Sequence, residues 1–480
     1  MSGFRLKVAI ICTVLFAGSW CLAQTPSNLF WLSLSRETYL KHIGIWLGIL
    51  LFIYLALSWA GNHSHEAENR LALFFAAISP LNLLDYGMRS IFGEVSKWPK
   101  QILLIWAVIS VLIFLLAVFA ALRVHITRNF LHKAIQVAIP PCILLFYYAI
   151  PSEFIVLNIY KPRKNGDRPP IHLILFDMLS YEFLLNGSTI SAHYPNFEAF
   201  SHEADVFTNT YAPGSSTAAT IPRLVTGIDF VEVRHPTTQW IGRTNASTQM
   251  LPISSFESLF SSADKYGYDI FLRGFALPYL NNFGDHIQSG RTFAYNSLWR
   301  LGMHSLIWPI LSPGGIQHQQ TVDSMLQEYL TRIRRDSRNT LFYTHWNIPH
   351  DPFIYDQNGH MLNRIELIKQ MITTPDREEK YKHQLRGTDA VFGQLIQAMK
   401  ESGTYDKSLV IVTSDHNIAG FGFDMKRVPL FIKRPHQRSP RIIHSTVTTL
   451  KCVDYIESFI RYGNLENTLL RINQPEWPLS

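Results

Sequence analysis

Acidic and histidine side chains follow three separate apolar runs of this 480-residue chain. They are Asp177 at the end of ILFD, His345 and His350 in THWNIPHDP, and Asp415 and His416 after IVTS. Carboxylate oxygens together with imidazole nitrogens suit zinc or another divalent first-row metal such as manganese. Each residue alone has an ordinary alternative, because Asp177 could cap a helix and a single histidine is common in a core. Their joint placement predicts a metal site.

A turn rich in glycine, serine and threonine supplies a hydroxyl group for the same chemistry. Its sequence, APGSSTAATIPRLVTG over residues 212–227, places Thr217 near the start of an expected helix. The free N–H groups and the positive dipole end of such a helix attract an anion such as phosphate. A threonine hydroxyl is a poor nucleophile until a metal favours its alkoxide. The alternative is that Ser215, Ser216 or Thr217 only caps the helix.

An α/β fold must position these side chains. Short apolar runs that fit buried strands of a parallel sheet occur at residues 171–176, 269–272, 340–344, 409–413 and 428–432. Helical patterns alternate with them at residues 195–203, 254–265, 322–334, 378–401 and 447–462. This alternation predicts a doubly wound sheet with helices on both faces. Ligands of such sheets bind beyond the carboxyl ends of the strands, where the acidic and histidine side chains lie.

The N-terminal third is apolar and poor in charge. Residues 1–150 hold 11 of the 43 Lys and Arg and 5 of the 36 Asp and Glu. A membrane-spanning helix needs about 20 mostly apolar residues. Five segments qualify or nearly qualify, at residues 8–23, 43–60, 71–84, 102–122 and 134–150. We therefore expect a multi-span helical membrane domain over residues 1–151, a linker over 152–170 and a catalytic domain over 171–480.

The first apolar segment has two interpretations. Arg5 and Lys7 precede it, so it is either a cleaved signal peptide or the first membrane span. In both cases the catalytic domain lies outside the cytoplasm, provided that the N-terminus starts inside and the other four segments cross. The basic stretch KPRKNGDRPP at residues 161–170 either contacts lipid headgroups or forms a solvated tether.

Composition excludes two function classes. The formal net charge of +7 comes almost entirely from the apolar N-terminal third, so it does not indicate a nucleic-acid partner. Four cysteines in 480 residues exclude a disulfide scaffold.

The order of these motifs is similar to a known family. A strand that ends in aspartate, a threonine turn, IPHDP and TSDHN resemble the sulfatase-like branch of the alkaline phosphatase superfamily. Within that branch the chain resembles membrane-anchored phosphoethanolamine transferases, with lipoteichoic acid synthases as relatives. The resemblance implies a multi-span membrane domain followed by an alkaline-phosphatase/sulfatase-like doubly wound α/β domain outside the cytoplasm.

The resemblance also implies roles for single residues. The metal ligands fall on Asp177, Thr217, Asp415 and His416. Thr217 is in addition the nucleophile, because it matches the first threonine of the transferases' T-x-x-[ST]-x-P pattern. The substrate-side histidine falls on His350. Two weaker expectations are that His345 faces the phosphate or is structural, and that Arg223 neutralises substrate charge or lies at the surface.

The chain also departs from its relatives. Sulfatases need Cys or Ser in C/S-x-P-x-R for conversion to formylglycine, and here Thr217 leads TAATI. This argues against sulfate-ester hydrolysis. Met178 follows Asp177 where sulfatases have a second acid, which does not fit a full calcium site. The transferases have a further histidine soon after the Asp-His pair, and none occurs here between Asn417 and Pro435, which leaves a second metal position open.

The expected protein is a metal-dependent enzyme of the inner membrane with a periplasmic catalytic domain. Zinc is the expected metal. The expected activity moves phosphoethanolamine, or a related phospho-alcohol, from a membrane phospholipid to an envelope glycan or lipid through a phospho-threonine intermediate. One alternative is a membrane-anchored sulfatase-like phosphodiesterase or other hydrolase, in which water replaces the acceptor. The other is a non-catalytic lipid-sensing membrane protein on an inherited enzyme fold.

Overall fold

The computed structural model describes residues 2–16, 36–78, 156, 158–235, 238–293, 314–372 and 376–462. These residues divide into two compact units, one that ends at residue 78 and one that begins at residue 156.

The first unit is helical. Helix α3 (Arg36–His63) contacts both α1 (Ser2–Phe16) and α4 (His65–Ile78). Among the described residues, one helical segment is long and apolar enough to cross a membrane, Trp46–His63 within α3. It overlaps the predicted span at 43–60, whereas 8–23 and 71–84 are described only in part and 102–122 and 134–150 lie outside the described residues. The multi-span domain therefore stays a prediction.

The first helix is an integral part of this unit. Apolar side chains of α1, among them Val8 and Cys12, form one buried cluster with Ile53, Leu57 and other residues of α3 and α4. Polar contacts add to this packing, because Nε of Arg5 lies 2.9 Å from Oε1 of the fully buried Glu68.

The second unit is built on a nine-stranded sheet with the strand order β1-β11-β10-β12-β2-β13-β14-β5-β15. In chain order the strands are β1 (Asn158–Tyr160), β2 (Ile171–Asp177), β5 (Asp205–Phe207), β10 (Asp269–Phe275), β11 (Ser289–Phe293), β12 (Thr340–Pro349), β13 (Leu409–Ser414), β14 (Leu430–Lys433) and β15 (Arg441–Ile443). Every residue of β2, β10, β12, β13 and β14 is buried. Such strands are covered on both faces.

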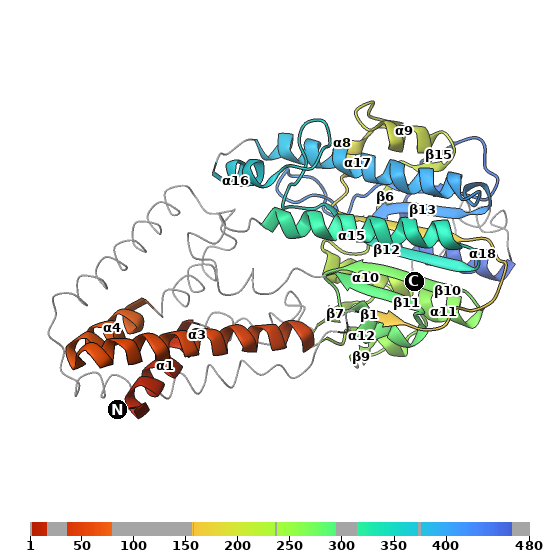
Figure 1. The fold of residues 1–480 in the computed structure, drawn as a ribbon. Helices are drawn as coiled ribbons and strands as arrows, with labels where there is room; N and C mark the ends of the chain where they lie inside the picture. The colour runs from red at the N-terminus through yellow and green to blue at the C-terminus, as the bar shows by residue number, and fades with distance from the viewer. Residues whose placement is uncertain are drawn as a thin grey trace. The chain divides into compact units, whose positions relative to one another are not determined.

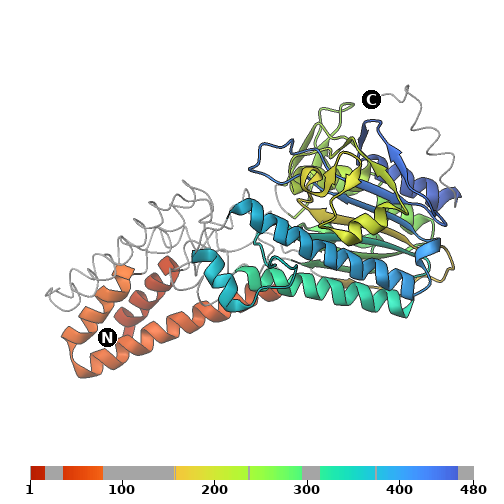
Figure 2. The same ribbon diagram turned by 90° about the horizontal axis from the view of Figure 1, so that it is seen from above.

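Helices cover the two faces of this sheet (Figures 1 and 2). Helices α9 (Pro195–Ser201), α15 (Gly314–Arg335) and α17 (Arg377–Glu401) pack together on one face. Helices α10 (Thr217–Thr226), α11 (Leu259–Lys265) and α18 (Lys451–Tyr462) pack together on the other. This arrangement confirms the predicted α/β sheet with helices on both faces.

Small elements complete the unit. The helices are α8 (Tyr181–Leu184), α12 (Tyr279–Phe283) and α16 (Arg364–Ile372). Short strands form three further sheets: β3 (Leu185–Asn186) with β4 (Thr189–Ile190), β6 (Thr210–Tyr211) with β16 (Val447–Thr448), and β7 (Glu232–Arg234) with β8 (Ile241–Arg243) and β9 (Leu251–Pro252).

All five predicted strands are present, but the sheet is not wholly parallel. Strands β11, β10, β12, β2 and β13 run parallel, whereas β14, the predicted strand at 428–432, is antiparallel to β13. A parallel neighbour needs a crossover connection, usually a helix. The chain between Ser414 and Leu430 contains no helix, so it turns back beside β13.

Two predicted helices begin later in the chain than expected. The helix expected from residue 254 begins at Leu259, because Ser258 caps it: the Ser258 hydroxyl accepts the N–H of Ser261, which returns a hydrogen bond. The helix expected from residue 447 begins at Lys451, because residues 447–448 form β16.

The basic stretch 161–170 lies against the α/β unit. Nζ of Lys161 donates to the carbonyl oxygens of Gly284 and Asp285, and Nε of Arg163 lies 2.8 Å from a carboxylate oxygen of Asp269. Protein groups therefore occupy at least part of the basic surface for which lipid headgroups were one expectation.

Candidate metal centre and nucleophile

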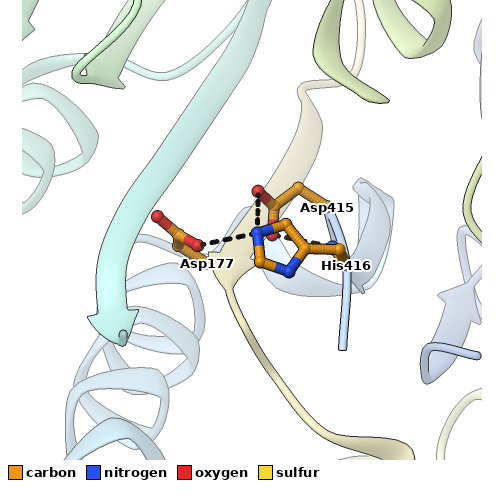
Figure 3. Close-up of side chains that lie close together, drawn as sticks. All are labelled: Asp177, Asp415 and His416. Atoms are coloured by element: carbon orange, nitrogen blue, oxygen red, sulfur yellow. Dashed lines mark hydrogen bonds and ion pairs between the residues drawn. The ribbon is translucent and has the colours of Figure 1, made fainter. Parts of the chain in front are cut away.

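Three neighbouring parallel strands bring the predicted ligands together. Strand β2 ends at Asp177 and is flanked by β12 and β13. Ser414, the last residue of β13, pairs with Phe176, so Asp415 and His416 emerge beside Asp177 (Figure 3). The structure thus brings the predicted Asp177, Asp415 and His416 together at the carboxyl ends of these central strands.

Their ligand atoms have the spacing of a metal site. One ligand atom from each of the three residues lies within 4.8 Å of the others, and all three residues are buried. Nε2 of His416 lies 3.7 Å from Oδ1 of Asp177 and 3.5 Å from Oδ2 of Asp415. Bonds of about 2.0–2.2 Å to a tetrahedral zinc put ligand atoms roughly 3.4 Å apart. The observed spacing fits such an ion.

Two of these atoms have no hydrogen-bond partner. Oδ1 of Asp177 and Oδ2 of Asp415 are buried and unpaired among the described residues. Buried polar atoms almost always have a partner, and an unpaired one needs an explanation such as an ion. A cation bound between the two carboxylates and the imidazole supplies that explanation.

Asp415 is fixed through its other oxygen. Oδ1 accepts the backbone N–H of His416 at 2.8 Å and that of Met178 at 3.2 Å. The Met178 N–H follows Asp177, so its bond ties the end of β2 to the end of β13, whereas the His416 bond lies within one segment. The carboxylate thereby directs Oδ2 into the candidate site.

The predicted nucleophile lies next to this cluster. Thr217 is the first residue of α10, and its Oγ1 is 3.3 Å from Nε2 of His416. The helix is capped by Ser216, whose hydroxyl accepts the backbone N–H of Ala219. The capping role that could have explained Thr217 therefore belongs to its neighbour. The Thr217 hydroxyl is left to the site, with the side chain 7% exposed.

The pKa values of the two carboxyl groups, Asp177 and Asp415, are shifted in opposite directions. Burial, and next the charge of Asp415, raise the pKa of Asp177 to about 7. Burial acts to raise the pKa of Asp415 as well, but the nearby His416 and His345, together with hydrogen bonds such as that from the Met178 N–H, outweigh burial and lower this pKa. A proton therefore competes with a cation for Asp177 near neutral pH.

His350 lies directly after β12, beside Asp351. Its Nδ1 is 2.9 Å from Oδ1 of Asp351. Burial acts to lower the pKa of His350, but the negative charges of Asp177 and Asp351 outweigh it and raise the pKa to about 10. A protonated His350, with Nδ1–H held by Asp351, is chemically able to donate a hydrogen bond or a proton from Nε2.

His345 lies deeper in the protein than His350. It lies within β12, opposite Leu175 of β2, and is fully buried. Its Nδ1 is 2.8 Å from the hydroxyl of Tyr279, and its Nε2 is 3.8 Å from Oδ2 of Asp415. Burial lowers the pKa of His345 to about 4, so the ring is neutral at physiological pH.

The side chain of Arg223 forms hydrogen bonds with backbone carbonyl groups of the fold. Its Nε and one terminal nitrogen donate to the carbonyl oxygen of Phe230, and the other terminal nitrogen donates to that of Ala219. These bonds brace α10 against the loop that follows it. The suggestion that Arg223 neutralises substrate charge stays a prediction.

Sequence inspection did not identify the residues that support the site. Tyr381 of α17 donates from its hydroxyl to the carbonyl oxygen of Met178 and accepts the N–H of Ser180. Met178 has a φ of 66°, which is uncommon for a residue other than glycine, and the Tyr381 bonds hold this turn. No local pattern points to Tyr381 or Tyr279, whereas Asp351 could have been noticed from its place beside His350.

Comparison with known proteins identifies the family of the α/β unit. The family model described as Sulfatase matches residues 171–462. No curated protein matches the chain. Many solved structures are similar to the chain, and three of them, all at low identity, are as follows. The phosphonate monoester hydrolase of Agrobacterium radiobacter is 16% identical with a TM-score of 0.43, over 61% of this chain and 74% of that one. The corresponding enzyme of Silicibacter pomeroyi is 13% identical with a TM-score of 0.43, over 61% and 73%. An alkaline phosphatase superfamily protein from Vibrio parahaemolyticus is 14% identical with a TM-score of 0.41, over 64% and 69%.

Proposed function

This chain belongs to the sulfatase family, in the sulfatase-like branch of the alkaline phosphatase superfamily, and from that premise we propose that it transfers a phospholipid head group through Thr217. The superfamily consists of metal-dependent enzymes that hydrolyse or transfer phosphoryl and sulfuryl groups. One observation carries the proposal: the Thr217 hydroxyl lies 3.3 Å from Nε2 of His416, beside two buried carboxylate oxygens that lack partners.

Asp177, Asp415 and His416 are the residues that would hold the metal, with Thr217 as the fourth ligand. A set of two carboxylates, one imidazole and one hydroxyl suits zinc. When bound, the ion supplies a positive charge that lowers the pKa of the Thr217 hydroxyl and makes it a nucleophile at neutral pH.

The chain's own residues account for the remaining steps. Oγ1 of Thr217 attacks the phosphorus of the donor phosphodiester, and the bond from phosphorus to the oxygen of diacylglycerol breaks. His350 donates the proton that this oxygen needs to leave as an alcohol. In the second step an acceptor hydroxyl attacks the phosphorus of the phospho-threonine, its proton passes to His350, and the bond from phosphorus to Oγ1 of Thr217 breaks.

Threonine at this position favours phosphoryl over sulfuryl chemistry. Formylglycine forms from Cys or Ser, and the segment that starts at Thr217 is TAATI. Hydrolysis of sulfate esters by the formylglycine route therefore does not fit this site. A phospho-threonine intermediate needs no modification of the side chain.

We further propose that the N-terminal third anchors the enzyme in the inner membrane, with the α/β unit in the periplasm. A membrane anchor keeps the site close to its lipid donor and raises the effective concentration of that donor. The acceptor is then a glycan or lipid of the cell envelope. The apolar segment Trp46–His63 supports the anchor.

A hydrolase is the second candidate, and the segment IPHDPFIYDQNG favours it because it resembles generic sulfatase-like hydrolases. The first step would be the same, and water would replace the acceptor in the second. The two functions therefore differ in the product and not in the metal site.

The test uses the full-length protein in detergent with phosphatidylethanolamine labelled in its head group. Transfer places the label on an added envelope glycan or lipid, whereas hydrolysis releases labelled phosphoethanolamine to water. T217A should lose at least about a thousandfold in rate and still bind zinc. The matched variant S216A removes the neighbouring cap, so it should cost about 1 kcal/mol of stability and keep the activity. Full activity in T217A would refute both functions.

A further inference from the structure

A chain of hydrogen bonds leads from the core to His345, which lies next to the candidate metal site. The hydroxyl of Tyr343 donates to the hydroxyl of Tyr279 at 3.4 Å, and that hydroxyl lies 2.8 Å from Nδ1 of His345. All three side chains are fully buried. Nε2 of His345, on the far side of the ring, lies 3.8 Å from Oδ2 of Asp415.

The place of the Tyr279 ring is defined by its surroundings. Trp240 meets this ring edge to face, with the centroids 5.8 Å apart, and Tyr343 does so at 5.5 Å. Gly274 of β10 lies directly beneath it, because a Cβ atom at that position would overlap the ring. Tight packing of this kind holds the hydroxyl where it meets His345.

Electrostatics determine which nitrogen of His345 carries the proton. Nε2 of His345 and Oδ2 of Asp415 lie 3.8 Å apart, and among the described residues neither atom has a hydrogen-bond partner. A lone pair on Nε2 would face the negative oxygen, whereas an N–H there is attracted to it. With the proton on Nε2, Nδ1 must accept a hydrogen bond, which the Tyr279 hydroxyl can donate. Tyr343 then supplies the hydrogen bond that the Tyr279 oxygen accepts.

We propose that Tyr279 and His345 are positioning residues of the metal centre: Tyr279 sets the tautomer of His345, whose Nε2–H holds Oδ2 of Asp415 in the orientation that binds the metal. Asp415 then has backbone N–H groups bound at Oδ1, and the N–H of His345 attracts Oδ2 from 3.8 Å. This inference rests on the proposed function only in taking Asp415 as a metal ligand. His345 itself does not belong to the group of mutually close ligand atoms.

A His345 ring that carries its proton on Nδ1 would lead to a different result. The His345 ring also interacts with the backbone of Phe275, whose carbonyl would be the acceptor if the ring donated from Nδ1. In that arrangement Tyr279 would be dispensable, and Nε2 would carry a lone pair.

Zinc affinity of the full-length protein, measured by competition with a chelator, separates the two arrangements without any substrate. Groups that orient metal ligands typically contribute 10–100-fold to metal affinity. Y279F is therefore expected to bind zinc about 10–100-fold more weakly than the wild type. Y329F is the matched control, because Tyr329 makes the same 2.8 Å bond to Nδ1 of His172, another buried histidine. That histidine lies near the start of β2, away from the site, so Y329F should bind zinc like the wild type.

A second pair of variants tests the Nε2 donor itself. Glutamine can place an N–H where Nε2 of His345 lies, and it does not depend on Tyr279 for a tautomer. H345Q should keep zinc affinity within about threefold, and H345L should lose about as much as Y279F. Adding Y279F to H345Q should cause no further loss.

Three results would overturn the proposal. The first is equal zinc affinity in Y279F and Y329F. The second is equal affinity in H345Q and H345L, which decides the matter even if Y279F does not fold. The third is an additive loss in the double variant. Since zinc binding is measured without a phosphodiester, the proposal can fail while the phosphotransferase activity stands, and the reverse also holds.

Discussion

At the scale of single residues, the site depends on how each carboxylate oxygen is engaged. Asp415 has one oxygen bound to backbone N–H groups and the other directed into the site. Asp177 presents an unpaired oxygen and has a pKa raised to about 7. The metal centre is therefore sensitive to pH through Asp177.

Zinc affinity should fall as the pH drops below about 7. The pKa of Asp177 is raised, so this carboxyl is protonated below 7 and ionised above it, and only the ionised form binds a cation. We expect a loss of about tenfold per pH unit below 7 and a weaker dependence above it. Chelator competition across this range measures the effect. An affinity that is constant from pH 6 to 8 would contradict this assignment of the Asp177 pKa.

D351N should shift the pH dependence of catalysis. If His350 donates a proton, activity is lost as the pH rises through its pKa, which Asp177 and Asp351 raise. Bound metal cancels part of the Asp177 charge, so Asp351 becomes the main support of the protonated ring. Removing a neighbouring charge of this kind lowers a pKa by about 1–3 units. The alkaline limb of the rate profile should move to lower pH by that amount, and an unmoved limb would remove His350 from the role of acid.

At the scale of elements, the site is assembled by the adjacent strands β12, β2 and β13. Each was predictable from an apolar run, and the rule that ligands lie at the carboxyl ends of strands placed Asp177, Asp415 and His416 together. Tyr279 and Tyr381 were not predictable in this way. Tyr279 lies in a five-residue helix without a periodic pattern, and Tyr381 lies in a long helix that meets Met178 only after folding. The spacing of residues in the sequence does not reveal contacts between residues that lie far apart in the chain.

Y381F should weaken the turn after β2. It removes the partner of two buried backbone groups, the carbonyl of Met178 and the N–H of Ser180. A buried group without a partner costs about 1–3 kcal/mol, so the unfolding free energy should fall by about 2–4 kcal/mol. Denaturant unfolding measures this loss.

Y268F is the matched control for Y381F. Tyr268 is also buried, and its hydroxyl makes one bond, to the carbonyl of Pro169 before the start of β2. Y268F should cost about 1 kcal/mol and leave zinc affinity unchanged, whereas Y381F should also reduce that affinity. Equal effects of the two variants on zinc binding would show that the turn is not held by Tyr381.

At the scale of the whole molecule, the chain combines a helical N-terminal unit with a sulfatase-family domain. The fold class and the family of the α/β domain were predictable from motif order. The antiparallel course of β14 was not, because an apolar run records burial and carries no strand direction. The number of membrane spans remains a prediction, since two of the five apolar segments lie outside the described residues.

The proposed phospho-threonine intermediate can be detected by peptide mass spectrometry of the full-length protein after brief incubation with phosphatidylethanolamine. We expect a phosphoethanolamine adduct on Thr217 that forms with zinc, does not form when a chelator has removed the zinc, and is absent in D415N. Turnover of the lipid without an adduct on Thr217, or an adduct that forms equally well in D415N, would contradict this expectation.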